Sequence, residues 1–323
     1  MIEPANPGPP GYQALREAAA WLELTGRGVL RVTGEDRIRL LHALSSNHIE
    51  QLQPGQGCYA FFLNAQGHIL ADAHILRRTD DLLLDTEPEA AQLLAEHIER
   101  HIIADDVTVE DLTARTAVLA VEGPRAAAAL EALGAPRPEP LWHHADWEAR
   151  TVARLSATGL AGWRIFAPLA EREALARRLE AAGAVPADAA AMRIARLEVG
   201  KPRYGEDFGS RHLPQETQLF HALHFSKGCY LGQEIVERIR SRGHVRQVLL
   251  PLSVQTSEAP PPGAPILAGG KEAGEITSAA FSPAFCKVVA LGYLRQETLV
   301  PGATLKVLGA TATIRAPKPP ENA

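Results

Sequence analysis

Cysteine is scarce in this chain. Its 323 residues include only Cys58, Cys229 and Cys286, and an odd number of widely spaced thiols does not make a disulfide framework. No two of them have C-x-x-C spacing, so we predict no metal or cluster site and infer a reducing compartment. His97 and His101 have the i, i+4 spacing of a metal-binding pair, but no third ligand accompanies them. We expect an exposed helical pair.

Long apolar runs are also missing. No stretch approaches the roughly 18 consecutive apolar residues of a membrane-spanning helix. The opening residues, MIEPANPGPPG, show neither the basic and apolar regions of a signal peptide nor the Arg-rich pattern of a mitochondrial transit peptide. We therefore expect a cytoplasmic protein of bacterial type with no membrane contact.

Positive charge is not in excess. A formal net charge of −5 argues against bulk nucleic-acid binding, and we expect no direct nucleic-acid partner. A local basic cluster comprises Lys227, Arg238, Arg240, Arg242 and Arg246. Such a cluster is usually a solvated helix face, but arginine's planar fork also suits a carboxylate ligand. RNA contact is the third alternative, although interleaved aromatic residues are lacking.

Short strands and helices alternate along the rest of the chain. Tyr59–Leu63 and His68–Leu76 form a hairpin pattern, which favours an α+β fold over a doubly wound sheet. After Arg242, short strands separated by proline and glycine turns indicate a small antiparallel β-barrel. The predicted division is a disordered tail at 1–11, an α+β body at 12–242 of two subdomains split near 116–120, a barrel at 243–317, and a tail at 318–323.

The most specific motif is KGCYLGQE, at Lys227–Glu234. Cys229 lies between glycines, just before a segment that reads as a helix start and beside Lys227, where a thiolate is favoured. The alternative is an inert cysteine in a tight turn. Cys58 and Cys286 have apolar, strand-like surroundings. We expect fast alkylation of Cys229 and slow alkylation of the other two.

Three further segments accompany this motif. The first is RLEVG at Arg196–Gly200, which is followed by Tyr204-Gly205. The second is LNAQGHILAD at Leu63–Asp72. The third combines EITSAAFSP at Glu275–Pro283 with VALGYL at Val289–Leu294. Together the four segments resemble the YgfZ-type folate-binding proteins, which assist iron–sulfur cluster maturation, and their relatives, the aminomethyltransferases (T-proteins) of the glycine cleavage system. The resemblance implies a folate-binding body of two α+β subdomains with a C-terminal barrel.

The resemblance also implies a cofactor site. In that family the glutamate of RLE-x-G binds the folate pterin, so Glu198 is the predicted anchor. A carboxylate suits the pterin edge because it accepts two adjacent N–H groups. An isolated glutamate on a helix is ordinarily solvated, and Arg196 would contact the cofactor or orient this carboxylate. The other predicted folate contacts are Tyr204, Lys227, Arg238 and Arg242.

The hairpin strand supplies the candidate catalytic acid. The transferases usually carry two adjacent aspartates there, whereas this chain has Ala71 and Asp72. Asp72 and Cys229 are the predicted catalytic residues. The missing acid argues against aminomethyl transfer, and Asp72 alone would also serve to cap the hairpin or to pair with Arg77.

Two functions follow from the resemblance. The first hypothesis is a monomeric, tetrahydrofolate-binding accessory protein that supports assembly or repair of iron–sulfur enzymes. Its partners would be those enzymes or cluster-assembly factors, and Cys229 would be its functional thiol. The alternative is a folate-dependent aminomethyltransferase similar to the T-protein.

Overall fold

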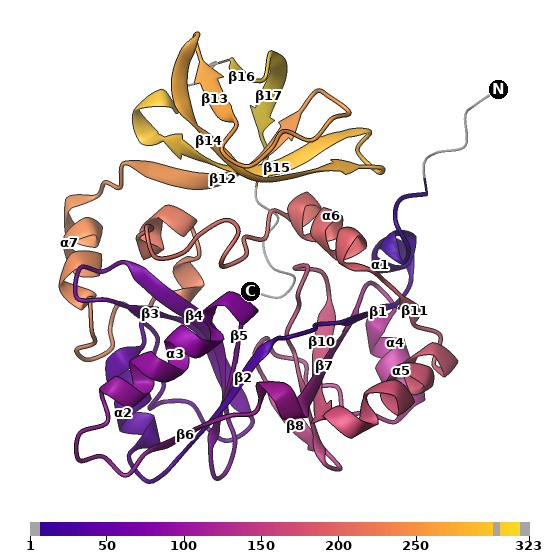
Figure 1. The fold of residues 1–323 in the computed structure, drawn as a ribbon, viewed down its shortest axis with the longest axis vertical. Coiled ribbons are helices and arrows are strands. Elements are labelled where there is room, and N and C mark those ends of the chain that lie inside the picture. The colour runs from indigo at the N-terminus through magenta and orange to yellow at the C-terminus, as the bar shows by residue number, and fades with distance from the viewer. Residues whose placement is uncertain (1–6, 300–303, 317–323) are drawn as a thin grey trace.

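A computed structural model describes residues 7–299 and 304–316 and shows two β-sheets side by side with a closed barrel lying across them (Figure 1). The predicted tail at 318–323 lies outside the described residues, as do residues 1–6 of the tail predicted at 1–11. Within the rest of that N-terminal tail, Gly11 packs so closely that an added Cβ would lie 2.3 Å from Ala187 Cα. Gly11 therefore belongs to the packed body.

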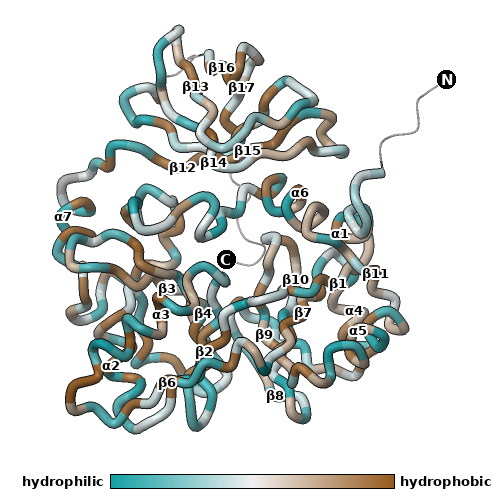
Figure 2. The backbone as a smooth tube through the Cα atoms, in the orientation of Figure 1, coloured by the Kyte–Doolittle hydropathy of each residue, from teal (hydrophilic) through white to brown (hydrophobic). Residues whose placement is uncertain are grey.

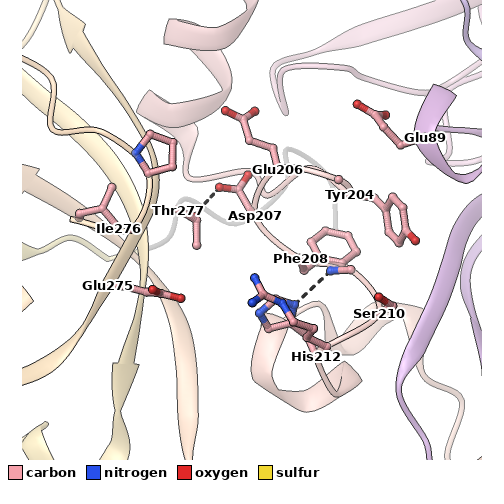
Figure 3. Close-up of a pocket in the computed structure, with 15 residues that line it drawn as sticks. Glu89, Tyr204, Glu206, Asp207, Phe208, Ser210, His212, Glu275, Ile276 and Thr277 are labelled. Carbon is pink, nitrogen blue, oxygen red and sulfur yellow. Dashed lines mark hydrogen bonds between the residues drawn. The ribbon is translucent and has the colours of Figure 1, made fainter. Parts of the chain in front are cut away.

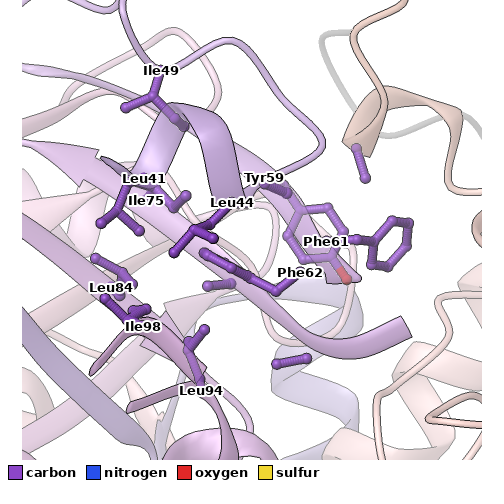
Figure 4. Close-up of a cluster of buried hydrophobic side chains, with 14 of the residues drawn as sticks. Leu41, Leu44, Ile49, Tyr59, Phe61, Phe62, Ile75, Leu84, Leu94 and Ile98 are labelled. Atoms are coloured by element: carbon purple, nitrogen blue, oxygen red, sulfur yellow. The ribbon is translucent and has the colours of Figure 1, made fainter. Parts of the chain in front are cut away.

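The first sheet has the strand order β3-β4-β5-β2-β6. Its strands are β2 (Gly28–Thr33), β3 (Gln56–Leu63), β4 (Ile69–Arg77), β5 (Leu82–Thr86) and β6 (Thr108–Asp111), accompanied by helices α2 (Arg37–Leu44) and α3 (Pro88–Arg100). Leu41 and Leu44 of α2 and Leu94 of α3 join Phe62 of β3 in one buried cluster (Figure 4). Hydrophobic stretches follow β2 and β3 in Figure 2, in agreement with their almost continuous burial.

The second sheet has the order β11-β1-β7-β10-β9-β8. Its strands are β1 (Ala20–Glu23), β7 (Thr116–Glu122), β8 (His144–Trp147), β9 (Arg150–Ala153), β10 (Gly162–Pro168) and β11 (Val185–Pro186), and its core includes residues of α4 (Ala126–Leu133) and α5 (Arg172–Ala181). The strand β1 precedes the first sheet in sequence yet pairs with β7. The predicted split near 116–120 left β1 out of the second subdomain, because a strand of four residues is too short to show hydrophobic alternation.

A buried ionic cluster joins the two sheets. Asp85 on β5 accepts hydrogen bonds from Arg27 Nε at 2.6 Å and Nη2 at 3.3 Å, and from Arg164 on β10. Asp85 has no exposed surface and Arg164 has 1%. Apolar side chains of both sheets, including Leu83 and Phe166, pack beside the cluster. The sheets are therefore held by paired charges as well as by apolar contact.

The closed barrel has the order β12-β15-β14-β13-β16-β17. Its strands are β12 (Gln247–Val254), β13 (Pro265–Ala268), β14 (Lys271–Ser282), β15 (Lys287–Arg295), β16 (Leu305–Val307) and β17 (Ala310–Ile314). Helix α7 (Gln233–Arg242) leads into it, and α6 (Ala189–Val199) lies between barrel and body near α1 (Tyr12–Glu17) (Figure 1). The predicted α+β body with a small antiparallel barrel is confirmed.

The helices are short. The structure describes 13 residues in α3, and none of the helices in the described ranges combines the length and apolarity that a bilayer crossing requires.

Replacing Asp85 by asparagine is expected to destabilise the body by about 3–5 kcal/mol, because it leaves the buried guanidinium group of Arg164 without its carboxylate partner, whereas Arg27 keeps its ion pair with Glu87. The measurement is the free energy of unfolding in urea. Asp80→Asn, an isosteric change at an exposed position, is the control. Equal stability of the two variants would show that the ionic cluster does not hold the sheets together.

Candidate functional site

Asp72, a predicted site residue, has a buried carboxylate oxygen to which none of the described residues donates a hydrogen bond. It is 7% exposed, and its Oδ2 accepts a hydrogen bond of 2.6 Å from the Tyr59 hydroxyl. Its Oδ1 finds no hydrogen-bond partner among the described residues. Arg77, the alternative partner, donates instead to the carbonyl of Leu52. Buried polar atoms are nearly always paired, so this open acceptor marks a place for a ligand.

The surroundings of Asp72 tune its acidity. Burial, followed by the nearby charge of Glu87, raises the pKa of Asp72 to about 6, against the opposing effects of the Tyr59 hydrogen bond and Arg27. A carboxyl group with a pKa near the working pH is suited to take up and return a proton. Perturbed groups of this kind concentrate at functional sites.

Aromatic rings form a wall beside this carboxyl group. The Tyr59 ring lies 5.0 Å from that of His74 and 5.5 Å from that of His221, and Trp142 stacks on His221 at 5.6 Å. Trp142 has φ 63°, a left-handed conformation that costs about 1–2 kcal/mol for a side-chain-bearing residue. Strain of this kind persists where the surrounding structure imposes it, often at functional sites.

Two imidazoles of this wall are neutral near pH 7. His221 keeps exposed surface, and burial, followed by the charge of Lys201, lowers its pKa to about 4. Burial, followed by Arg164 and Lys201, holds the pKa of His74 well below its ordinary value, and His74 Nδ1 finds no partner among the described residues. We call Asp72 and the rings of this wall the recess.

Lys201 is close enough to His221 and His74 for its charge to add to the lowering of their pKa by burial. Its Nζ donates to the carbonyl of Ser156, and burial, followed by Arg164, lowers its pKa to about 8. The loop that carries Ser156 is fixed by Glu122, which accepts hydrogen bonds from the Ser156 hydroxyl at 3.0 Å and the Thr158 amide at 3.1 Å. The lysine is thus held by a rigid loop.

Glu198, the predicted pterin anchor, has partners within the fold. Its carboxylate accepts hydrogen bonds from the Tyr12 hydroxyl and from Ser282 of the barrel at 2.5 Å. It also forms an ion pair of 2.7 Å with Arg16. These contacts join α1, α6 and the barrel, and the pterin role of Glu198 stays a prediction.

Arg196 and Tyr204 are also engaged within the fold. Arg196 forms buried ion pairs with Glu206 and, at 2.7 Å, with Asp207. The Tyr204 hydroxyl donates to the carbonyl of Leu70 at 2.5 Å. Both predicted folate contacts therefore have structural partners; Arg196 pairs with carboxylates other than Glu198.

The KGCYLGQE segment wraps over the end of α2. Lys227 Nζ donates to the carbonyls of His42 and Ser45, each at 2.5 Å, which directs its charge to the helix end. Its folate contact stays a prediction. Gly232 (φ 83°) approaches the hairpin turn so closely that a Cβ would lie 2.7 Å from the Asn64 carbonyl oxygen. Two motifs that are separate in sequence are therefore in contact.

The remaining basic residues lie on α7. Arg238 is exposed and pairs with Glu234 at 3.3 Å, as a solvated helix face would. The side chain of Arg242 lies outside the described part of the structure.

The three cysteines differ from expectation in one respect. Cys229 is exposed, Cys58 is buried, and Cys286 is exposed rather than enclosed in a strand. The Ser-Pro turn explains the difference, because Cys286 has φ 49° in the connection between β14 and β15.

The histidine pair of α3 also differs. His97 is 4% exposed, and its ring lies 6.3 Å from that of Phe62. The prediction that His97 is exposed is therefore wrong. Among the described residues no group of three or more potential ligands is placed to hold a metal.

A separate pocket of about 620 Å³ lies between the barrel and the body (Figure 3). Asp207 borders it and accepts hydrogen bonds from Thr277 at 2.6 Å and Ser278 at 2.5 Å of β14. Glu89 at its edge pairs with Arg203 at 2.9 Å. Asp207 is used to attach the barrel and Glu89 to bind the loop after α6, so this pocket does not replace the recess at Asp72 as the candidate site.

The two parts of the chain match two known domain families. The GCVT N-terminal domain matches residues 11–227, and the glycine cleavage T-protein C-terminal barrel domain matches residues 246–318. The chain belongs to the T-protein family.

Curated members of the family include similar proteins. An aminomethyltransferase of Rubrobacter xylanophilus is 31% identical over 296 residues, covering 89% of this chain and 79% of the relative. A putative chloroplastic transferase of Arabidopsis thaliana is 27% identical over 293 residues, with 88% and 67% covered.

The fold of the family is also seen in a solved structure. The glycine cleavage system aminomethyltransferase T of Bartonella henselae has a TM-score of 0.87 and 23% identity, with 95% of this chain and 88% of that chain covered. This likeness concerns the architecture of body and barrel.

Sequence reasoning missed most of the recess. Alternation along β4 offered one signal, because polar residues at 72 and 74 in an otherwise apolar strand share a face. Tyr59, Trp142, Lys201 and His221 carried no such signal, since they come together only through tertiary contacts.

Asp72→Asn is expected to stabilise the ligand-free protein at neutral pH. Because the folded state raises the pKa of Asp72 from 3.8 to about 6, the folded protein binds this proton more tightly than the unfolded chain. Stability from this group is therefore present below pH 4 and lost as pH rises through 6. The shift corresponds to about 3 kcal/mol.

Urea unfolding of wild type and Asp72→Asn at several pH values between 4 and 8 measures this effect. The advantage of the variant should grow between pH 4 and 6 and then level off. A pH-independent difference would contradict the raised pKa, and Asp80→Asn is again the control.

Native-state alkylation is expected to separate the thiols by burial. Iodoacetamide at pH 7.5 should modify Cys229 and Cys286, because both are exposed. Cys58 should react only after denaturation, because burial raises the pKa of its thiol to about 12. Peptide mass spectrometry measures the outcome, and rapid labelling of Cys58 in the folded protein would contradict it.

Proposed function

We propose that this protein is a folate-dependent one-carbon transferase of the T-protein type. The observation that carries the proposal is the open, buried oxygen of Asp72 beside the aromatic wall. The names of its relatives favour the same reading. This places the transferase, the alternative in the sequence-based interpretation, ahead of the iron–sulfur accessory role.

The missing second aspartate does not deprive the recess of an acid. Successive residues of a strand point to opposite faces, and Ala71 is fully buried in the apolar core cluster of the first sheet. Asp72 points instead to Tyr59 on the polar face. A carboxylate at position 71 would therefore lie away from the recess, and its absence is weak evidence against transfer.

A reduced folate fits the residues of the recess. The rings of Tyr59, His221 and Trp142 offer apolar faces to a flat pterin, and Asp72 Oδ1 accepts a hydrogen bond from a protonated ring nitrogen. When bound, folate supplies the nitrogen that carries the one-carbon unit. Tyr59 fixes the carboxyl group, and Asp72 takes a proton at Oδ1 and returns it.

Cys229 favours a second candidate function. Its thiol is exposed on a loop held by Lys227 and Gly232, where a partner protein can reach it. This suits a YgfZ-type accessory protein, monomeric and cytoplasmic, that serves iron–sulfur enzymes or their assembly factors with folate bound.

Tetrahydrofolate titration tests the first proposal. Wild type is expected to bind, and Asp72→Asn to bind about ten- to a hundred-fold more weakly, because a charged acceptor is lost. Asp80→Asn, the same change at an exposed position, is the matched control and should retain folate affinity. Equal affinity of wild type and Asp72→Asn would remove Asp72 from the site.

Turnover then separates the two candidates. With the other glycine cleavage components, wild type should transfer an aminomethyl group, and Asp72→Asn should be slower by about 10²–10⁴-fold. Folate binding without turnover would favour the accessory role. In that case Cys229→Ala should fail to restore iron–sulfur enzyme activity in cells that lack the protein.

A further inference from the structure

Three histidines outside the recess form a row of imidazole rings. The ring centroids of His42 and His48 are 4.7 Å apart, and those of His48 and His224 are 5.1 Å apart. His42 belongs to α2, His48 to the connection after α2, and His224 to the stretch that leads into the KGCYLGQE segment. A Cβ added at Gly228 would lie 3.9 Å from His42 Nε2, so this imidazole row lies against the KGCYLGQE segment.

Each ring of the row accepts a backbone amide at Nδ1. The donors are Ile49 to His42 at 3.3 Å, Gln51 to His48 at 3.4 Å and Ser226 to His224 at 3.3 Å. A neutral imidazole that accepts at Nδ1 carries its proton at Nε2, whereas an imidazolium carries protons on both nitrogens. Proton uptake therefore places a donor opposite each amide and removes the hydrogen bond.

The row lies among the contacts that attach the KGCYLGQE segment to α2. The His224 amide donates to the Ser46 carbonyl at 2.9 Å, and the Leu231 amide donates to the Ala43 carbonyl at 3.1 Å. Lys227 Nζ donates to carbonyls at the end of the same helix. Loss of the amide bonds to the row would therefore loosen both connections that meet there.

The charges at the row allow one proton and oppose more. Glu50 Oε2 lies 3.8 Å from His42 Nε2 and can balance one imidazolium. Burial, followed by the charge of Lys227, nevertheless lowers the pKa of His42, and burial, followed by the neighbouring imidazole and Lys227, lowers that of His224. The Cys58 thiol of β3 stays neutral, because burial raises its pKa to about 12.

Neighbouring elements bring further cations. Arg77 of β4 donates to the Glu50 carbonyl at 3.4 Å. Arg240 of α7 donates to the Phe225 carbonyl at 3.4 Å and is paired with Glu237 at 3.5 Å. Three imidazolium groups would therefore repel one another and Lys227 in surroundings that already hold arginine side chains.

We propose that the imidazole row is a pH-sensitive switch, which holds the KGCYLGQE segment on the end of α2 at neutral pH and releases it when the rings take up protons. Release frees the loop that carries Cys229 while the two sheets and the barrel stay folded. The switch does not depend on folate binding.

The direction of the pH effect follows from the two lowered pKa values. The attached state binds protons at His42 and His224 less tightly than the released state. Attachment is therefore stable above the ordinary imidazole pKa of about 6.5 and is lost as the pH falls through that value.

Hydrogen–deuterium exchange of the wild-type protein at pH 7.5 and 5.5 tests the switch. After correction for the intrinsic pH dependence of amide exchange, peptides from 221–232 should open at least about tenfold more at pH 5.5. One imidazole with a lowered pKa contributes up to about tenfold at one pH unit below 6.5. Peptides from β15 should not change, and equal changes in both regions, or none in 221–232, would overturn the proposal.

A double variant, His48→Asn with His224→Asn, removes two titrating rings. The asparagine amide oxygen accepts the same backbone N–H and does not titrate, so most of the rise at pH 5.5 should disappear. His244→Asn, at an exposed position, is the matched control and should keep the rise. A full rise in the double variant would overturn the proposal. If the double variant does not fold, as circular dichroism would show, the wild-type comparison with β15 decides the matter.

Discussion

The buried carboxylate of Asp85 is the contact on which the architecture of the site depends. It binds Arg27 from the first sheet and Arg164 from the second, and it has no exposed surface. A buried charge is tolerated only when it is paired and hydrogen-bonded, so the sheets keep the separation at which these bonds form. Burial, followed by the same Arg164, holds the pKa of His74 well below its ordinary value.

Helix α6 and the loop after it serve a comparable purpose for the barrel. Glu198 binds α1 and Ser282 of β14, and Asp207, paired with Arg196, binds Thr277 and Ser278. Arg315 donates to the carbonyl of Glu198 at the helix end at 2.6 Å. The acids of the RLEVG segment and the YGED run are therefore used in attaching one domain to the other.

The catalytic interpretation depends on strand geometry. Ala71 and Asp72 are neighbours in sequence, yet one lies in the apolar core and the other meets Tyr59. Two adjacent aspartates at positions 71 and 72 would therefore lie in different environments, one in the apolar core and one beside Tyr59. A single aspartate beside Tyr59, with a pKa raised to about 6 mainly by burial, would be the proton acceptor of the proposed one-carbon transfer.

The sequence by itself determined the fold class and the approximate extents of most helices and strands, and it made Asp72 a candidate site residue. Hydrophobic periodicity and turn residues are local signals, so α6 and the hairpin of β3 and β4 could be predicted from them. The short strand β1 and the exposure of Cys286 could not. Only the tertiary structure gave Glu198 and Lys227 their partners within the fold and brought Trp142 and His221 beside Tyr59, the hydrogen-bond partner of Asp72. The physical reason is that an ionisable or aromatic side chain has its partners chosen by packing between distant segments, which no local pattern encodes.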